Sequence, residues 1–310
     1  MSVRLLPVLL LVACADERPW AWSKVPIEGA PKSTVNQLFA LSENDVWGVS
    51  FPEVFHWDGK AWSVTAHDGP EHLWAVAPDD VWGVARGGSW FHWDGKRWSN
   101  GRVPEIAAQY LDFWGVVAWP NEVWATPGIE GYVRFDGTAW SVVEPPELKG
   151  WKLKRSFAIG RHYYAQAFHE TRPNGKYTVK ANVAHWDGEK WELIDQPPGY
   201  QIRGSAPDDV WLVLAPPRHW DGKTWSETPV PPKSGDLYDL YARSKTEAYA
   251  VGKRGVALKW DGKAWSELYA GRFDLFTVTG AATGPVWASG LHKGVVLRYP
   301  KLESEAPARH

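Results

Sequence analysis

Short apolar runs alternate with turn residues along most of the chain, and residues 73–99 show the pattern clearly. Apolar runs cover 73–77, 81–85 and 89–93, and a fourth strand-like run opens at 97–99. The runs are rich in Val, Trp and Phe, which favour strands. The pair Asp94-Gly95 supplies a tight hairpin turn before the last run. This stretch therefore predicts four antiparallel strands joined by short connections.

The same pattern recurs along the chain, and its clearest marker is the nine-residue phrase FHWDGKAWS at Phe55–Ser63. Five further copies follow: FHWDGKRWS (91–99), VRFDGTAWS (133–141), AHWDGEKWE (184–192), RHWDGKTWS (218–226) and LKWDGKAWS (258–266). Successive Asp-Gly pairs are 36, 42, 51, 34 and 40 residues apart. A repeat of this length with four strands is typical of the blade of a β-propeller.

The ends of the chain predict how the ring closes. The second strand of the unit can be located seven times, but the Asp-Gly turn occurs only six times. The seventh unit stops after Val295–Tyr299, and Trp20–Val25 near the N-terminus matches its missing outer strand. We therefore predict an all-β fold over residues 20–300: a seven-bladed β-propeller of four-stranded antiparallel blades, closed by an N-terminal strand that completes the last blade.

Tryptophan is the unusual feature of the composition, with 23 residues, and 17 of them fall at three positions of the repeat. These positions are the second strand, the site before Asp-Gly and the site three residues after Gly. A row of sugar-binding platforms is one interpretation. We favour the other, that the repeated Trp side chains form the core between blades, because packing at equivalent sites requires such repetition.

Charge and the N-terminus restrict the choice of partners and the location. With 34 Lys and Arg against 36 Asp and Glu, the net charge of −2 does not favour nucleic acid as a partner. Residues 1–13 read as a secretion signal, and Leu11-Val12-Ala13-Cys14 resembles a bacterial lipobox. We expect a lipoprotein acylated at Cys14, with a linker at 14–19 and a charged tail at 301–310. An ordinary signal peptide with an incidental Cys is the alternative.

The fourth repeat departs from the others, with 51 residues between Asp136 and Asp187. Strand-like runs at 163–169 and 177–183 flank Arg172–Lys176, which contains an Asn-Gly pair. We expect the second and third strands of this blade to extend beyond the ring. The hairpin is either a tolerated insertion or a docking element.

Two sets of residues outside the repeated phrase are candidates for ligand binding. The first is the off-repeat aromatic residues of the loops between blades, Tyr110, Trp151 and Tyr200, whose alternative role is to cap a blade edge. The second lies about ten residues before each second-strand aromatic residue and comprises Gln37, His72, Asp112, Lys154, Gln201, Asp239 and Asp274. Three Asp and a His at one mouth of the channel could hold a cation or a polar ligand. We favour a solvated rim and assign no metal and no cofactor.

The phrase DVWGV followed by HWDGxxW resembles a family of Trp-rich bacterial propeller repeats and, more loosely, the tectonin-type propellers, some of which are lectins. The resemblance implies the fold and leaves the ligand open, because one fold hosts many activities. The sequence has no GxSxG or HExxH motif. His56, His92, His185 and His219 stand before the turn in separate blades, so we interpret them as packing residues.

These features together predict a monomeric, lipid-anchored binding module of the cell envelope for a protein or glycan, with no catalytic residues. An envelope scaffold that docks through the fourth-blade hairpin is the first alternative. A glycan hydrolase or lyase that uses an acidic channel mouth is the second.

Overall fold

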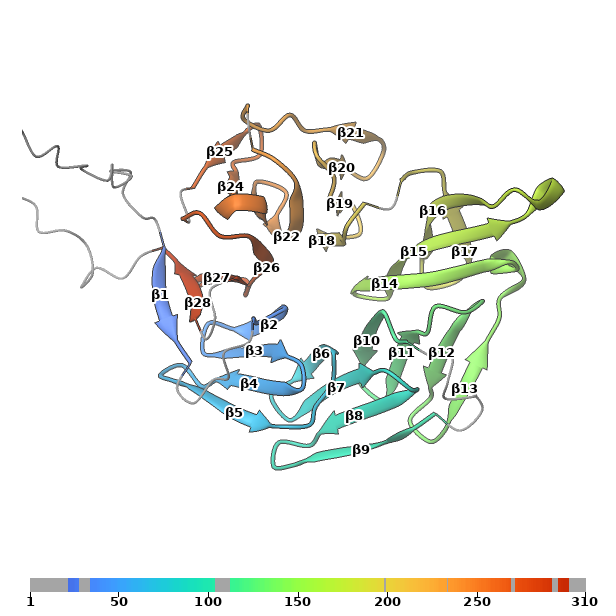
Figure 1. The fold of residues 1–310 in the computed structure, drawn as a ribbon, viewed down its shortest axis with the longest axis horizontal. Coiled ribbons are helices and arrows are strands. Elements are labelled where there is room, and N and C mark those ends of the chain that lie inside the picture. The colour runs from blue at the N-terminus through green and yellow to red at the C-terminus, as the bar shows by residue number, and fades with distance from the viewer. Residues whose placement is uncertain are drawn as a thin grey trace, which may run out of the picture.

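A computed structural model describes residues 22–27, 34–103, 112–197, 199–232, 234–268, 271–291 and 295–300. The described chain forms seven four-stranded antiparallel sheets arranged as blades around a central opening (Figure 1). In each blade the first strand lies nearest the opening and the fourth lies at the outer edge. The predicted seven-bladed propeller is confirmed.

The strands follow one another in chain order through the first six blades. Blades 1 to 3 are β2 (Gln37–Ser42), β3 (Asp45–Ser50), β4 (Glu53–Trp57) and β5 (Trp62–Ala66); β6 (His72–Ala77), β7 (Asp80–Ala85), β8 (Ser89–Trp93) and β9 (Trp98–Arg102); and β10 (Gly115–Trp119), β11 (Glu122–Thr126), β12 (Tyr132–Phe135) and β13 (Trp140–Val143). Blades 4 to 6 are β14 (Trp151–Ile159), β15 (His162–Thr171), β16 (Thr178–Trp186) and β17 (Trp191–Ile194); β18 (Ile202–Ala206), β19 (Asp209–Leu212), β20 (Arg218–Trp220) and β21 (Trp225–Glu227); and β22 (Leu237–Ser244), β23 (Glu247–Gly252), β24 (Ala257–Trp260) and β25 (Trp265–Glu267). Short 3-10 turns occupy Pro146–Leu148, Pro173–Gly175 and Lys253–Gly255.

Blade 7 joins the two ends of the chain, as predicted. It contains β26 (Leu275–Gly280), β27 (Val286–Gly290) and β28 (Val295–Tyr299), and its outer strand is β1 (Ser23–Pro26). The register pairs Ser23 with Arg298 and Pro26 with Val295. Figure 1 shows β1, in blue, beside β28, in red. The ring is therefore closed by backbone hydrogen bonds between segments that are far apart in sequence.

The Asp-Gly turn is a four-residue connection, which is longer than the sequence pattern suggested. In the first copy, Trp57 and Trp62 are the last paired residues of β4 and β5, so Asp58–Ala61 all lie in the turn. The Asp58 carboxylate accepts hydrogen bonds from the backbone N–H groups of Lys60 and Ala61, both at 2.9 Å. Gly59 has φ +93°, a conformation that favours glycine. The Asp side chain thus binds two N–H groups of the turn, in addition to the backbone hydrogen bond from Asp58 N–H to the Ala61 carbonyl oxygen at 3.3 Å.

The repeated Trp side chains form the contacts between neighbouring blades. Trp47 of β3 packs edge-on against Trp93 and Trp98 of the next blade, with ring centroids 5.9 and 6.0 Å apart. Trp287 of blade 7 makes the equivalent contacts with Trp57 and Trp62 of blade 1. Such pairs add about 0.5–1.5 kcal/mol each to the burial of the rings. The core interpretation of the repeated Trp residues is therefore supported at the contacts between blades.

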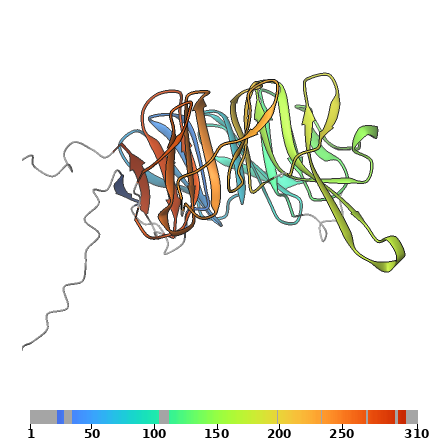
Figure 2. The ribbon, with the colours of Figure 1, turned by 90° about the horizontal axis from the view of Figure 1, so that it is seen from above.

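Connections at the two ends of the strands define two faces of the ring. We call the end at which the inner strands begin the loop face, and the opposite end, which carries the Asp-Gly turns, the turn face. The loop face carries the connections between blades and those between second and third strands. The predicted fourth-blade hairpin belongs to it: β15 and β16 remain paired out to Thr171 and Thr178, and they project beyond the ring (Figure 2).

Candidate binding face and central channel

The His and Asp residues of the repeat form a structural clamp within each blade. In blade 1, His56 Nε2 lies 3.0 Å from Asp45 Oδ1, and the imidazole packs on Trp47 with centroids 4.3 Å apart. The same pairs in blades 2 and 5 are His92 with Asp80, at 2.9 Å, and His219 with Asp209, at 2.7 Å. Each His is thus held between an indole and a carboxylate of its own blade. Within the described ranges, no three His, Cys, Asp or Glu side chains are grouped closely enough to hold a metal ion.

Two other blades keep the clamp with different residues. In blade 3, Arg134 replaces the His and Glu122 replaces the Asp, and Arg134 Nε donates to Glu122 at 2.8 Å. In blade 4, His162 stands at the Asp position, 3.0 Å from His185, which also contacts Glu192 at 2.7 Å. Blade 3 thus changes both partners and blade 4 changes one, and in each case the side chains remain hydrogen-bonded between the second and third strands.

A cavity of about 700 Å³ occupies the central opening and is lined by residues of all seven inner strands. Its wall combines aromatic rings with a few polar groups. The aromatic residues are Phe39, Trp74, Trp114, Phe157, Tyr200, Tyr238, Tyr241 and Phe276. This volume lies in the range of small-molecule sites, which are typically apolar with few polar groups.

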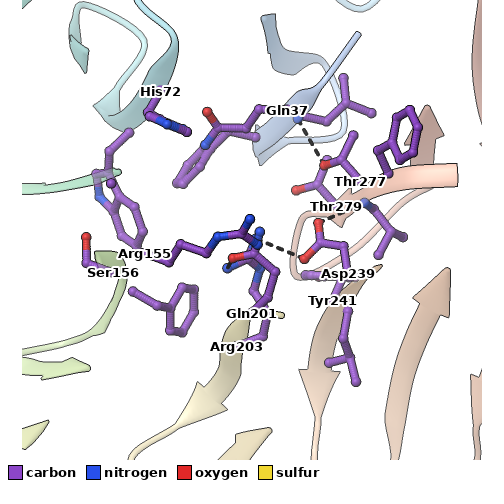
Figure 3. A pocket seen from close by; sticks show the side chains of 18 of the residues that line it. Gln37, His72, Arg155, Ser156, Gln201, Arg203, Asp239, Tyr241, Thr277 and Thr279 are labelled. Carbon is purple, nitrogen blue, oxygen red and sulfur yellow. Dashed lines mark hydrogen bonds and ion pairs between the residues drawn. The ribbon is translucent and has the colours of Figure 1, made fainter. Parts of the chain in front are cut away.

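Three charged side chains line this cavity, and their sum is positive. Arg203 Nη2 forms an ion pair with Asp239 Oδ1 at 2.9 Å, and the backbone N–H of Val278 donates to the other carboxylate oxygen at 3.1 Å. Arg155 Nη1 donates to the carbonyl oxygen of Tyr200 at 2.6 Å. Figure 3 shows both guanidinium groups extending into the opening, with Asp239 beside them.

Burial changes the titration of these groups. Burial raises the pKa of Asp239, and the Arg203 guanidinium and the Val278 N–H oppose this rise. Burial and the neighbouring Arg203 lower the pKa of Arg155. Burial, with a smaller effect of Arg155, lowers the pKa of His72 to about 4. His72 is therefore neutral at pH 7, and the charge of the cavity comes from the two Arg and Asp239.

The sequence-predicted candidates fall in different places. His72, Tyr200 and Asp239 line the cavity, together with Gln37 and Gln201. Asp112 and Asp274 are not among its lining residues. Asp112 is exposed, and Asp274 Oδ1 accepts a hydrogen bond from the backbone N–H of Arg254 at 2.8 Å. The described residues therefore do not bring the three Asp together as an acidic channel mouth.

The remaining candidates are a buried residue and two that the structure does not describe. Trp151 is buried in a core cluster that also contains Tyr132 and Leu148, and its ring contacts His169 edge-on at 5.4 Å. Tyr110 and Cys14 lie outside the described residues.

The repeat pattern of the sequence does not predict the two arginine residues of the cavity, Arg155 and Arg203. Arg155 is an extra residue in β14, where the pairing with β15 shifts between Lys154 and Ser156, and its φ is +39°. A bulge of this kind re-aims a side chain, and no periodic pattern reveals it. Arg203 was overlooked because the ten-residue spacing selected its neighbour Gln201. The signal that could have found both is an Arg within an inner-strand segment.

The exposed apolar side chains lie on one face. Seven large apolar residues are exposed in the described chain: Phe51, Trp114, Tyr177, Val179, Tyr200, Phe273 and Leu291. Each stands directly before an inner strand, between a second and a third strand, or at the start of a third strand, and all of these positions belong to the loop face. Lys154 Nζ lies 4.6 Å from the centroid of the Trp114 ring at this face.

The fold and its central cavity define a seven-bladed β-propeller with an opening of ligand size. No helix in the described chain is long and apolar enough to cross a membrane. No protein-family model matches the sequence, and no curated protein matches it either.

Solved structures with a similar fold include two structures of YCF48 and a WD40 domain. The structure described as YCF48 bound to D1 peptide is 16% identical, covers 90% of this chain and 96% of its own, and has a TM-score of 0.69. YCF48 from Cyanidioschyzon merolae is 15% identical, with coverages of 90% and 98% and a TM-score of 0.64. The WD40 propeller of Doa1 is 8% identical, with coverages of 90% and 96% and a TM-score of 0.65. At these identities the similarity establishes the fold alone.

Proposed function

We propose that this protein is a non-catalytic binding module that recognises a protein partner through its loop face. The observation that carries the proposal is the one-sided placement of the seven exposed apolar side chains. The seven side chains come from five blades and all lie on one face, and such an uneven distribution favours that face as the interaction surface. Aromatic residues also dominate the energetics of protein interfaces, and five of the seven are aromatic. A similar ring, YCF48, is described as bound to a D1 peptide, which supports recognition of a polypeptide by such a fold.

The hairpin of blade 4 extends this surface. Tyr177 and Val179 are about half exposed near its tip, at 53% and 47%. The Arg172 guanidinium lies 5.9 Å from the centroid of the Tyr177 ring. Tyr and Arg are both enriched among the hot-spot residues of protein interfaces. The hairpin therefore supplies a projecting contact, and the scaffold function is a second use of the same face.

Site-specific photo-crosslinking tests the proposal in the native cell. A photoreactive amino acid placed at Phe51, Tyr177 or Phe273 is expected to trap one common protein. The same group at Lys60 or Lys96, which lie in exposed turns of the opposite face, is the matched control. Equal trapping from both faces would contradict the assignment. Binding of the purified protein to a glycan array, with no protein trapped, would assign the face to carbohydrate recognition instead.

A variant with a shortened hairpin tests whether the projecting part of β15 and β16 contributes to partner binding. Replacing residues 170–179 by Asn-Gly joins His169 to Lys180, which are paired in the sheet, through a two-residue turn. The ring is expected to keep its urea midpoint, while trapping at Phe273 is reduced. Unchanged trapping would show that the hairpin does not contribute to the contact.

We further propose that residues 1–13 direct export and that Cys14 carries the lipid anchor. The lipobox-like segment and the position of the single Cys support this proposal. Radiolabelled palmitate is expected to enter the wild-type protein and not the Cys14→Ala variant, which should leave the membrane fraction. Labelling of Cys14→Ala would contradict the assignment.

A further inference from the structure

Arg155 is held in the central channel without a carboxylate partner. No carboxylate oxygen of the described residues lies within 4.0 Å of its guanidinium, whereas Arg203 is paired with Asp239. Among the described residues, the Arg155 guanidinium donates a hydrogen bond to a neutral group, the carbonyl oxygen of Tyr200. A guanidinium has five donors in a planar fork that matches a carboxylate. Most of the donors of Arg155 are thus free to face a ligand.

The backbone at Arg155 is adapted to present this side chain. Lys154 pairs with Gln166 and Ser156 pairs with Ala165, so Arg155 is the unpaired residue of a bulge. Its positive φ of +39° is unfavourable for a side-chain-bearing residue. Backbone strain of this kind concentrates at binding sites, where the geometry of a side chain matters more than local stability.

The charge balance of the cavity restricts the kind of ligand. Arg155, Arg203 and Asp239 are the charged groups of its lining, and His72 is neutral at pH 7. With Asp239 ionised in its pair with Arg203, their sum is one positive charge in a partly buried space, where an unpaired charge is costly. A ligand with one negative charge compensates this positive charge, whereas a second negative charge on the ligand would be left uncompensated.

The aromatic residues of the cavity wall favour a ligand with a flat apolar body. Trp74 contacts Phe157 with centroids 5.8 Å apart, and the Arg203 guanidinium lies 5.8 Å from the Phe157 ring. Tyr200 and Tyr238 pack edge-on at 5.8 Å near the loop-face end of the cavity. Aromatic rings around a guanidinium group accommodate a planar ligand by stacking and fix its charged end by hydrogen bonds.

We propose that the central channel is a binding site for a small monoanionic aromatic carboxylate, with Arg155 as the residue that pairs with the carboxylate group. The apolar body of the ligand lies against Trp74, Phe157 and Tyr238. Trp114 and Tyr200 belong both to the cavity wall and to the protein-binding surface proposed above. The contact of a small ligand with Arg155 is measured without the protein partner, so a failure of the crosslinking experiment does not decide this proposal.

Calorimetric titration with 2-naphthoate and its neutral analogue 2-naphthamide tests the proposal on the intact ring. The acid is expected to bind at least about tenfold more tightly than the amide, because only the acid offers an ionic partner to Arg155. The dianion 2-naphthyl phosphate is expected to bind more weakly than the acid. Equal affinity of acid and amide would overturn the proposal, as would tighter binding of the phosphate or no binding of the acid at millimolar concentration.

Two variants and a matched control assign the carboxylate contact. Arg155→Gln is expected to weaken 2-naphthoate binding by roughly 10- to 100-fold, which is the loss associated with one charged hydrogen bond. Arg155→Lys keeps the charge and should retain part of the affinity. Arg161→Gln removes an exposed Arg of the same blade that bonds Glu122 outside the cavity, and it should bind like wild type. If Arg155→Gln does not fold, by near-ultraviolet circular dichroism, then the Lys variant and the acid-to-amide ratio decide. Wild-type affinity in a folded Arg155→Gln protein would overturn the assignment.

Discussion

The Trp22 side chain anchors the N-terminal strand β1 to blade 7, and its removal should weaken the pairing of β1 with β28. Trp22 is 2% exposed and packs among Tyr249, Leu275 and Leu297, with its ring 5.3 Å from that of Tyr299. A buried Trp removes roughly 150–250 Å² from water, which at about 25 cal/mol per Å² corresponds to about 4–6 kcal/mol. Measured Trp→Ala losses in cores, about 3–5 kcal/mol, agree with this range. We therefore expect Trp22→Ala to lower the free energy of unfolding by about 3–5 kcal/mol.

Urea unfolding and amide hydrogen exchange measure this effect separately. The urea midpoint gives the loss of stability, and exchange in β28 reports whether β1 still protects it. Trp225→Ala is the matched control, since Trp225 has the same position in its blade but is only partly buried; we expect a loss of about 1–2 kcal/mol there. Trp22→Ala should also speed exchange at Val296 and Leu297 more than at β24. A free energy of unfolding within about 0.5 kcal/mol of wild type, with protection of β28 unchanged, would refute closure by this strand.

Two further predictions concern backbone packing and pH. Gly290→Ala places a Cβ well inside van der Waals contact with the carbonyl oxygen of Asp274, so we expect a loss of about 1–3 kcal/mol by urea unfolding. Gly48→Ala, whose nearest neighbours are movable side-chain carbons at 3.3 and 3.4 Å, should lose less, and equal losses would contradict this explanation. Because the folded-state pKa of His72 is about 4 and the ordinary value is 6.5, the unfolded chain takes up the proton first, and stability should fall as the pH is lowered from 6.5 towards 4. His72→Gln should reduce this loss of stability by roughly 1–3 kcal/mol. A smaller loss should remain because burial also lowers the pKa of His185. An unchanged dependence of stability on pH in His72→Gln would show that His72 does not titrate as described.

The fold was predictable from the sequence because the same physical requirement is met seven times. Each blade must bury an aromatic side chain of its second strand against the next blade, so the Trp positions recur at fixed places. The division of blade 7 followed from the same count, since the phrase ended at Tyr299 and resumed near Trp22. The long hairpin was visible because an Asn-Gly pair lay within an extended apolar pattern.

The binding sites were less predictable, because they lie where the repeat is broken. In blades 3 and 7 the strict ten-residue spacing falls on Trp114 and Thr277, which line the cavity. The longer spacing allowed for turns in these two blades selected Asp112 and Asp274 instead, 12 and 13 residues before Trp124 and Trp287, and both Asp residues precede the inner strand. Arg155 depends on a one-residue bulge, which shifts the side-chain alternation without changing composition. The exposed Trp114 and Phe273 belong to loops that share no common pattern.

The Trp side chains of the second strands pack against the following blade, so the two sides of a blade differ. Trp47 reaches forward into blade 2, Trp211 into blade 6, and Trp287 into blade 1. Each blade thus offers one surface to its successor and a different one to its predecessor, which is a heterologous, head-to-tail interface. In an open array the two terminal surfaces would remain unsatisfied and would recruit further copies. Closure by β1 buries both of these surfaces, so other molecules contact the ring through its rim, its two faces and its central channel.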